Sequence, residues 1–279
     1  MELEISKQEF EAAIPAAREP KSQIYSAIRP FLLAKADLLS TQVLGEPGTE
    51  AAESGTDDLC GQVRSCVKRL VCVKAFLEEM RGLDLVLTAT GFGVVSTQNT
   101  APASKQRVDA LEGQMRRLER LLTGQLLTLL FQVPGWSRTA QRQSCVATLF
   151  YEFGMLQQFA GISHPKSEDW DVAVPSMFAA DAFLRKHLGN AYMDELLEQL
   201  TSSSLTADNS PIVVMCQRYI GAYVAQNMRL KEETYMQLIN RLEADLTKYP
   251  TYAHGEGYQL NHFTPYENHA EDSAFHFVG

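Results

Sequence analysis

Apolar residues recur every three or four positions over most of the chain, which is the spacing of an amphipathic helix. The clearest run extends from Leu59 to Met80 and follows Asp57, a residue type that commonly caps the start of a helix. A second run, from Val108 to Leu129, has near-heptad spacing and follows Ser104, another candidate cap. Two later runs, over 213–224 and 235–246, repeat the pattern. The sequence therefore predicts a mainly α fold.

One segment departs from the helical pattern. Leu83, Leu85 and Leu87 alternate with other residues, and Gly91 and Gly93 follow before the β-branched pair Val94-Val95. Alternation followed by glycine and a second β-prone run predicts a β-hairpin at about residues 83–96. The glycines do not indicate a nucleotide-binding loop, because no third glycine and no immediate helix follow them.

The two halves of the chain resemble one another. Residues 28–45 align with residues 172–189 at a constant shift of 144, which pairs Ile28 with Val172 and Leu44-Gly45 with Leu188-Gly189. Glycine after an apolar helical run is a common stop signal, so both helices are expected to end at the same place. Each half then enters a polar or small-residue stretch, 45–55 or 201–210, that is expected to be a flexible linker. We therefore predict two tandem pseudo-repeated helical units, 1–140 and 141–249, of which the first carries the inserted hairpin.

The last thirty residues differ from the rest of the chain. Residues 250–279 contain no Lys or Arg but hold six Tyr or Phe residues and four of the six histidines. The histidines lie seven or eight residues apart, which fits no common metal-ligand spacing. An extended C-terminal tail that docks through its aromatic side chains is predicted, and residues 273–278 could add a strand to a sheet edge.

The chain has 279 residues, 45% hydrophobic residues and a formal net charge of -9. These values are typical of a globular protein, and the negative charge disfavours general nucleic-acid binding. The one basic cluster, Arg116, Arg117 and Arg120, is expected to be a solvated helix face. Residues 1–5 carry acidic groups and lack the apolar core of a secretory signal, and no apolar run is long enough to span a bilayer. A cytoplasmic location is expected, or a virion location if the chain is phage-derived.

Candidate chemistry is sparse. The five cysteines are Cys60, Cys66, Cys72, Cys145 and Cys216, with no CxxC pair among them. Three are six residues apart and would point in different directions on a helix, so free thiols are expected rather than a metal site. His187 lies in an apolar helical run and is expected to be a hydrogen-bonded structural residue. No hydrolase, zinc-protease, P-loop or EF-hand motif is found, so no catalytic residue and no cofactor is predicted.

A family resemblance is carried by the segment 83–108 together with Ile28-Arg29-Pro30, Leu44-Gly45 and the run Leu188-Gly189-Asn190-Ala191-Tyr192. In these features the chain resembles an uncharacterised family from Bacteroidetes genomes, their prophages and their tailed phages. The resemblance implies tandem helical units and a virion structural role, as a head–tail connector or adaptor that forms an oligomeric ring with the portal. It implies no catalytic, cofactor or metal residue.

Protein partners are therefore expected, through self-association or contact with portal and neck proteins, without specific nucleic-acid or membrane binding. The candidate contacts lie on the two features that the halves do not share, the hairpin and the tail; they are Val86, Phe92, Val94, Tyr258, Phe263, Tyr266, Phe275 and Phe277. Two alternatives stay open. One is a helical scaffold or regulatory protein-binding module without a virion role, and the other is an enzyme whose site the sequence does not reveal.

Overall fold

A computed structural model of the chain describes residues 1, 3–17, 23–83, 85–88, 91–94 and 104–262. The first half holds α1 (Lys7–Ala13), α2 (Ile24–Leu39), a π turn (Ser40–Leu44), α3 (Gly45–Glu53), α4 (Asp58–Glu79), α5 (Lys105–Leu130) and α6 (Ala140–Cys145). The second half holds α7 (Met155–Gln158), α8 (Ser167–Leu188), α9 (Asn190–Thr201), α10 (Asn209–Val224), α11 (Met228–Glu243), α12 (Pro250–Ala253) and α13 (Glu256–Asn261). The mainly α prediction is confirmed.

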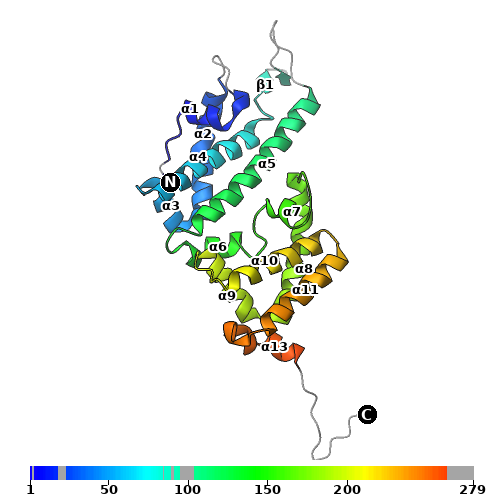
Figure 1. Cartoon of the computed structure of the whole chain (residues 1–279). Helices are drawn as coiled ribbons and strands as arrows, with labels where there is room; N and C mark the ends of the chain where they lie inside the picture. Colours follow the sequence, from blue (N-terminus) through cyan, green and yellow to red (C-terminus); the bar gives the residue numbers. More distant parts are fainter. Residues whose placement is uncertain (2, 18–22, 84, 89–90, 95–103, 263–279) are drawn as a thin grey trace, which may run out of the picture.

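The first half is built around α4, which packs against α1, α2, α3 and α5 (Figure 1). Asp57 caps α4 by accepting a hydrogen bond from the Cys60 backbone N–H at 2.7 Å, as the sequence predicts. In the second half α10 has the corresponding place, between α8 and α11. Each half is thus a small helical layer with one central helix.

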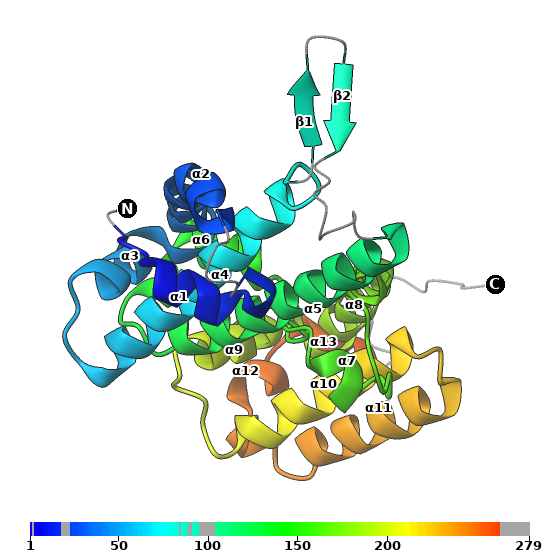
Figure 2. The same cartoon turned by 90° about the horizontal axis from the view of Figure 1, so that it is seen from above.

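Two short strands, β1 (Leu85–Thr88) and β2 (Gly91–Val94), lie between α4 and α5 and pair antiparallel, Leu85 with Val94 and Thr88 with Gly91. They project away from the helical body (Figure 2). Only the backbone pairing of this segment is described.

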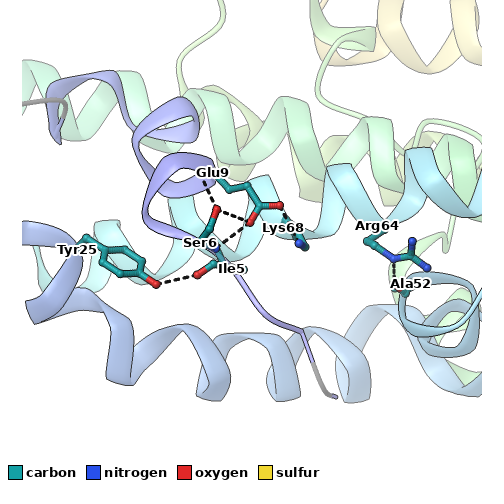
Figure 3. Close-up of polar contacts among 7 residues, drawn as sticks. All are labelled: Ile5, Ser6, Glu9, Tyr25, Ala52, Arg64 and Lys68. Atoms are coloured by element: carbon teal, nitrogen blue, oxygen red, sulfur yellow. Dashed lines mark hydrogen bonds and ion pairs between the residues drawn. The ribbon is translucent and has the colours of Figure 1, made fainter.

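The junction of α1, α2 and α4 is held by polar contacts (Figure 3). Ser6 and Glu9 form a capping box at the start of α1, and the Glu9 carboxylate also accepts from Lys68 Nζ of α4 at 2.8 Å. Tyr25 of α2 donates its hydroxyl hydrogen to the Ile5 carbonyl at 2.8 Å. Arg64 Nε of α4 donates to the carbonyl of Ala52, in the last turn of α3, at 2.6 Å. The N-terminal segment is therefore tied to two helices at once.

This junction predicts a pH dependence. Hydrogen bonds from Lys68 and Ser6 lower the pKa of Glu9 from 4.5 to about 2. The folded state favours the charged carboxylate, so the stabilisation is complete above about pH 4.5 and is lost as the pH falls toward 2. Because the pair is partly exposed, Glu9→Gln should cost about 1 kcal/mol or less at pH 7. Urea unfolding of both proteins at pH 7 and pH 3 measures this; a cost that is the same at both values would contradict the assignment to the carboxylate.

The predicted linker at 45–55 is wrong, because residues 45–53 form α3. Small residues allow this helix to lie close to its neighbours: a Cβ at Gly48 would come within 2.9 Å of Leu130 Cδ2, and Ala52 is fully buried. Close packing therefore outweighs the poor helix propensity of Gly-Glu-Pro-Gly. The stretch 202–208 between α9 and α10 is non-helical, as the sequence predicts.

The π turn at Ser40–Leu44 is held from outside by the segment that follows α5. Three consecutive carbonyl groups of the turn accept hydrogen bonds from side chains: Thr41 from Gln141 Nε2 at 3.0 Å, Gln42 from Cys145 Sγ at 3.5 Å and Val43 from Trp136 Nε1 at 3.0 Å. Gly45 follows with a φ of 61°, a conformation that costs glycine little. The end of α2 is thus fixed by residues 93 to 103 positions away.

The constant shift of 144 that the sequence predicts between the halves is wrong for α2 and α8. Ile28 is fully buried, but its predicted equivalent Val172 is 78% exposed. The buried positions of the two helices therefore do not align at this shift.

The tail is also less extended than predicted, since residues 250–253 and 256–261 form α12 and α13, and α13 packs against α8. Asn261 Nδ2 donates to the His187 carbonyl at 3.1 Å, and Asn261 Oδ1 lies 3.1 Å from His187 Nδ1. The prediction that His187 is hydrogen-bonded is confirmed. Gly257 lies against Gly189, which allows the two backbones to approach closely. The beginning of the predicted tail therefore belongs to the folded body.

Candidate interaction surface

The predicted contact residues fall into three groups. Val86 lies on β1, and Phe92 and Val94 lie on β2, in the projecting pair of strands, where side chains are not described. Tyr258 lies on α13, half-buried, with its ring 5.6 Å from that of Tyr252 and 4.1 Å from that of His262. Phe263, Tyr266, Phe275 and Phe277 lie outside the described residues. Their role in binding stays a prediction, although part of the Tyr258 ring already packs within the fold.

Large apolar side chains that sequence reasoning did not single out are exposed on the outer helices. On α2 they include Leu33, which is 56% exposed, and on α8 they include Val172 and Phe178, which are 78% and 52% exposed. Smaller exposed apolar residues lie beside them, Ala27, Pro30 and Ala34 on α2 and Pro175 and Ala179 on α8. We call Ala27, Pro30, Leu33 and Ala34 the α2 face, and Val172, Pro175, Phe178 and Ala179 the α8 face.

Both faces lie opposite the core side of their helices. With about 100° per residue, the buried residues of α2 (Ile28, Leu32, Ala36 and Leu39) point roughly opposite to the α2 face. The same relation holds on α8 for Ala173, Met177, Asp181 and Leu184. α2 packs on α4 and α8 packs on α10 through these buried sides. Each first long helix is therefore apolar on its core side and again on its solvent side.

The basic cluster on α5 is not simply a solvated face. Arg117 Nε donates to the Pro165 carbonyl at 3.2 Å, and Arg120 donates to Ser167 Oγ at 3.2 Å and to the Asp171 carboxylate at 2.7 Å. Arg116 pairs with Glu112 on its own helix. Two of the three guanidinium groups therefore tie α5 to the start of α8, which corrects the predicted role.

A second polar junction joins α6 to α9. The Nε of Arg142 donates to Thr201 Oγ1 at 3.0 Å, and burial lowers the pKa of Arg142. Nearby, Arg185 of α8 pairs with Asp181 at 2.7 Å and with Asp194 at 2.6 Å. The open groove beside these residues, of about 530 Å³, is lined by Arg142, which joins α6 to α9, and by Arg185 and Asp194, which join α8 to α9.

A larger cleft, of about 890 Å³, opens between α4 and α5. The polar side chains that line it include Gln62, Arg69, Gln125 and Glu152. Glu152 lies against Gly124, where a Cβ would come within 3.0 Å of the Glu152 side chain. Burial raises the pKa of Glu152, and in the described part of the chain no cation is paired with it.

Glu152→Gln is expected to raise the free energy of unfolding at pH 7. Because the folded-state pKa is raised, the ionised carboxylate destabilises the fold at a pH above both its folded and its unfolded value. The gain should shrink as the pH falls through the folded pKa and vanish below the ordinary value of 4.5. Guanidinium unfolding at pH 7 and pH 4 measures it, and a variant that is less stable than wild type at pH 7 would contradict the argument.

The cysteines show no sign of joint chemistry. All five are free thiols; Cys66, Cys72 and Cys216 are buried, and Cys60 and Cys145 are half-buried. Burial raises the pKa of Cys66 to about 11 and that of Cys72 to about 12, so both remain protonated at neutral pH. Across the residues that the structure describes, no group of three or more His, Cys, Asp or Glu side chains could hold a metal ion. No helix among them is long and apolar enough to cross a bilayer.

Comparison with protein families gives one match. Residues 24–146 match the model of a family of unknown function, DUF6712. The match runs from the start of α2 to just past α6, so it includes the helices of the first half after α1 and the segment that caps the π turn. Searches of curated proteins and of solved structures gave no match. The similarity to this family is therefore confined to the part of the first half that follows α1.

Proposed function

We propose that this chain is a non-enzymatic assembly protein, a phage or prophage structural component of the head–tail connector or adaptor kind that forms a ring with the portal. The observation that carries the proposal is the exposure of apolar faces on two outer helices, α2 and α8. Contiguous apolar surface on a soluble body is typical of a protein–protein contact. Ring subunits need two different contact surfaces, and this chain offers two.

Charge and resemblance support the same proposal. A net charge of -9 would let DNA pass along a ring without adhering to it. The resemblance in Ile28-Arg29-Pro30 and Leu44-Gly45 lies within the part that matches the family model. A cytoplasmic site of synthesis followed by incorporation into virions is part of the proposal.

The proposal is tested by mass spectrometry of particles released from the source strain after prophage induction. Peptides of this chain are expected in purified particles, at a constant copy number well below that of the capsid protein. Their absence from intact particles, while the chain is present in the lysate, would overturn the virion role.

A second candidate function is a helical scaffold or regulatory protein-binding module without a virion role. The cleft between α4 and α5 favours it, because Arg69 and Glu152 line the same opening and neither forms an ion pair within the described part of the chain. A peptide that carries one acidic and one basic side chain would suit such a cleft. Particles that lack the chain would favour this candidate.

We also propose that the two halves arose by duplication of one helical unit. With a shift of 145 before the π turn, Ile28, Leu32 and Leu39 pair with Ala173, Met177 and Leu184, all of them buried. Pro30 then pairs with Pro175. After the turn the shift is 144, and Leu44-Gly45 pairs with Leu188-Gly189, where both glycines have positive φ.

A single-residue insertion in the first copy accounts for the change of shift, because it converts an α-helical turn into a π turn. An experimental structure in which α2–α5 and α8–α11 superpose poorly, with one residue of the turn omitted, would contradict the duplication.

A further inference from the structure

We propose that the α2 face of one copy of this chain packs against the α8 face of a second copy, so that the chain assembles head to tail. This rests on the proposed function and names its contact. The geometry and the charges of the two faces carry the inference.

The two faces have the same design. At a shift of 145, Ala27 corresponds to Val172, Pro30 to Pro175, Leu33 to Phe178 and Ala34 to Ala179. All eight residues are apolar and exposed. The residues extend over about two helical turns, a length that suits side-by-side packing of two helices.

The small members of each face allow close approach. Ala27, Pro30 and Ala34 leave the α2 face shallow beside Leu33, and Pro175 and Ala179 do the same beside Phe178 on the α8 face. A large side chain of one face can therefore lie over the small residues of the other, as ridges fit grooves in helix packing. A contact between these two faces covers the most exposed large apolar side chains of both helices.

Charges at the ends of the faces select the second copy and its orientation. Near the start of the α2 face lies Arg29, and at its end lies Asp37; Glu168 and Asp171 precede the α8 face, and Lys186 follows it. Arg29, Glu168 and Lys186 form no ion pair within the described part of the chain. Asp37 pairs with the N-terminal amine yet has a side chain that is 56% exposed, and Asp171 pairs with Arg120.

Parallel packing of α2 against α8 brings Arg29 near the two acidic residues and Asp37 near Lys186. Antiparallel packing of the same helices would bring like charges together at both ends, which is unfavourable. The complementary pattern therefore favours a parallel α2–α8 contact between copies.

Such a contact uses different surfaces on the two partners. An open assembly of any length therefore has an unpaired α2 face at one end and an unpaired α8 face at the other. The assembly closes into a ring if the rotation between copies allows it, and otherwise it grows as a filament. The hairpin strands β1 and β2, between α4 and α5, are not part of this contact.

The test uses Leu33→Glu and Phe178→Glu, with Val172→Glu as a second α8 variant and Met236→Glu as the matched control. Met236 is 63% exposed on α11, outside both faces, so its substitution adds the same charge elsewhere. Circular dichroism melting establishes that each variant is folded. The mass is measured by sedimentation velocity and light scattering over a range of protein concentrations.

Wild type and Met236→Glu are expected to assemble beyond the mass of one chain, 31.1 kDa, as the concentration rises. Each face variant alone should remain a monomer. An equimolar mixture of Leu33→Glu and Phe178→Glu should give a species of two chains and no larger one, because one intact α8 face then meets one intact α2 face.

A wild-type protein that is monomeric at about 1 mM would overturn the inference, since a contact with a Kd of 1 mM is populated at that concentration. If only one of the two face variants abolishes assembly, the contact joins two identical faces. That result would also overturn the inference. Particle mass spectrometry is independent of these measurements. Assembly through both faces without incorporation into particles would refute the virion role and leave the α2–α8 contact standing.

Discussion

Trp136→Ala is expected to lower the free energy of unfolding by about 3–5 kcal/mol, the largest effect of any single substitution considered for this chain. Trp136 is fully buried, with its ring 5.9 Å from that of Phe131. Its indole N–H also donates to the Val43 carbonyl in the π turn. The substitution therefore leaves a large cavity and removes the donor from a partly buried carbonyl. Guanidinium unfolding followed by far-ultraviolet circular dichroism measures the loss.

Trp136→Phe separates the two contributions. It keeps most of the ring volume but removes the donor, so its cost should be about 1–3 kcal/mol. An alanine variant that is no less stable than the phenylalanine variant would show that packing at this position contributes little.

Gly257→Ala is expected to detach α13 from α8 and to cost about 1–3 kcal/mol through overpacking. The added Cβ would lie within 2.5 Å of the His187 carbonyl oxygen and of the Leu188 carbonyl carbon, both of which are backbone atoms. Since backbone atoms cannot rotate away, α13 must shift. Faster amide hydrogen exchange over residues 256–261 is the expected signature.

Gly113→Ala is the matched control. Gly113 lies within α5 with no atom within 4 Å of the position that a Cβ would take, so alanine there should stabilise the protein by about 0.5–1 kcal/mol. Unchanged exchange in α13 of the Gly257 variant would contradict the proposed close contact.

Local signals in the sequence predict the long helices well. The apolar run after Asp57 and the run after Ser104 correspond to α4 and α5. Asp57 caps α4 with its side chain, whereas Ser104 occupies the N-cap position of α5 without a side-chain capping hydrogen bond. α3 and α13 are missed for a common reason. Both contain glycines that lower local helix propensity but allow close packing, and packing depends on residues distant in the sequence.

The two apolar faces are only partly visible in the sequence. Between Ile24 and Leu39 only Arg29, Lys35 and Asp37 are charged, so the helix is apolar on more than one side. The side of α2 that faces the core is decided by where α4 packs, and hydrophobic periodicity alone does not show this. For the same reason the sequence directs attention to the hairpin and the tail, whose composition differs most from that of the helices, and not to these two faces.

The capping of the π turn has a consequence for synthesis on the ribosome. The donors to its three carbonyls come from Trp136, Gln141 and Cys145, so α2 and α3 can be complete in sequence long before their connection is closed. In the nascent chain, the connection between α2 and α3 should therefore lack its full set of hydrogen bonds until residue 145 has left the exit tunnel. A chain that ends before residue 136 lacks all three donors. Proteases should therefore cleave its α2–α3 connection faster than that of a chain that extends beyond residue 145.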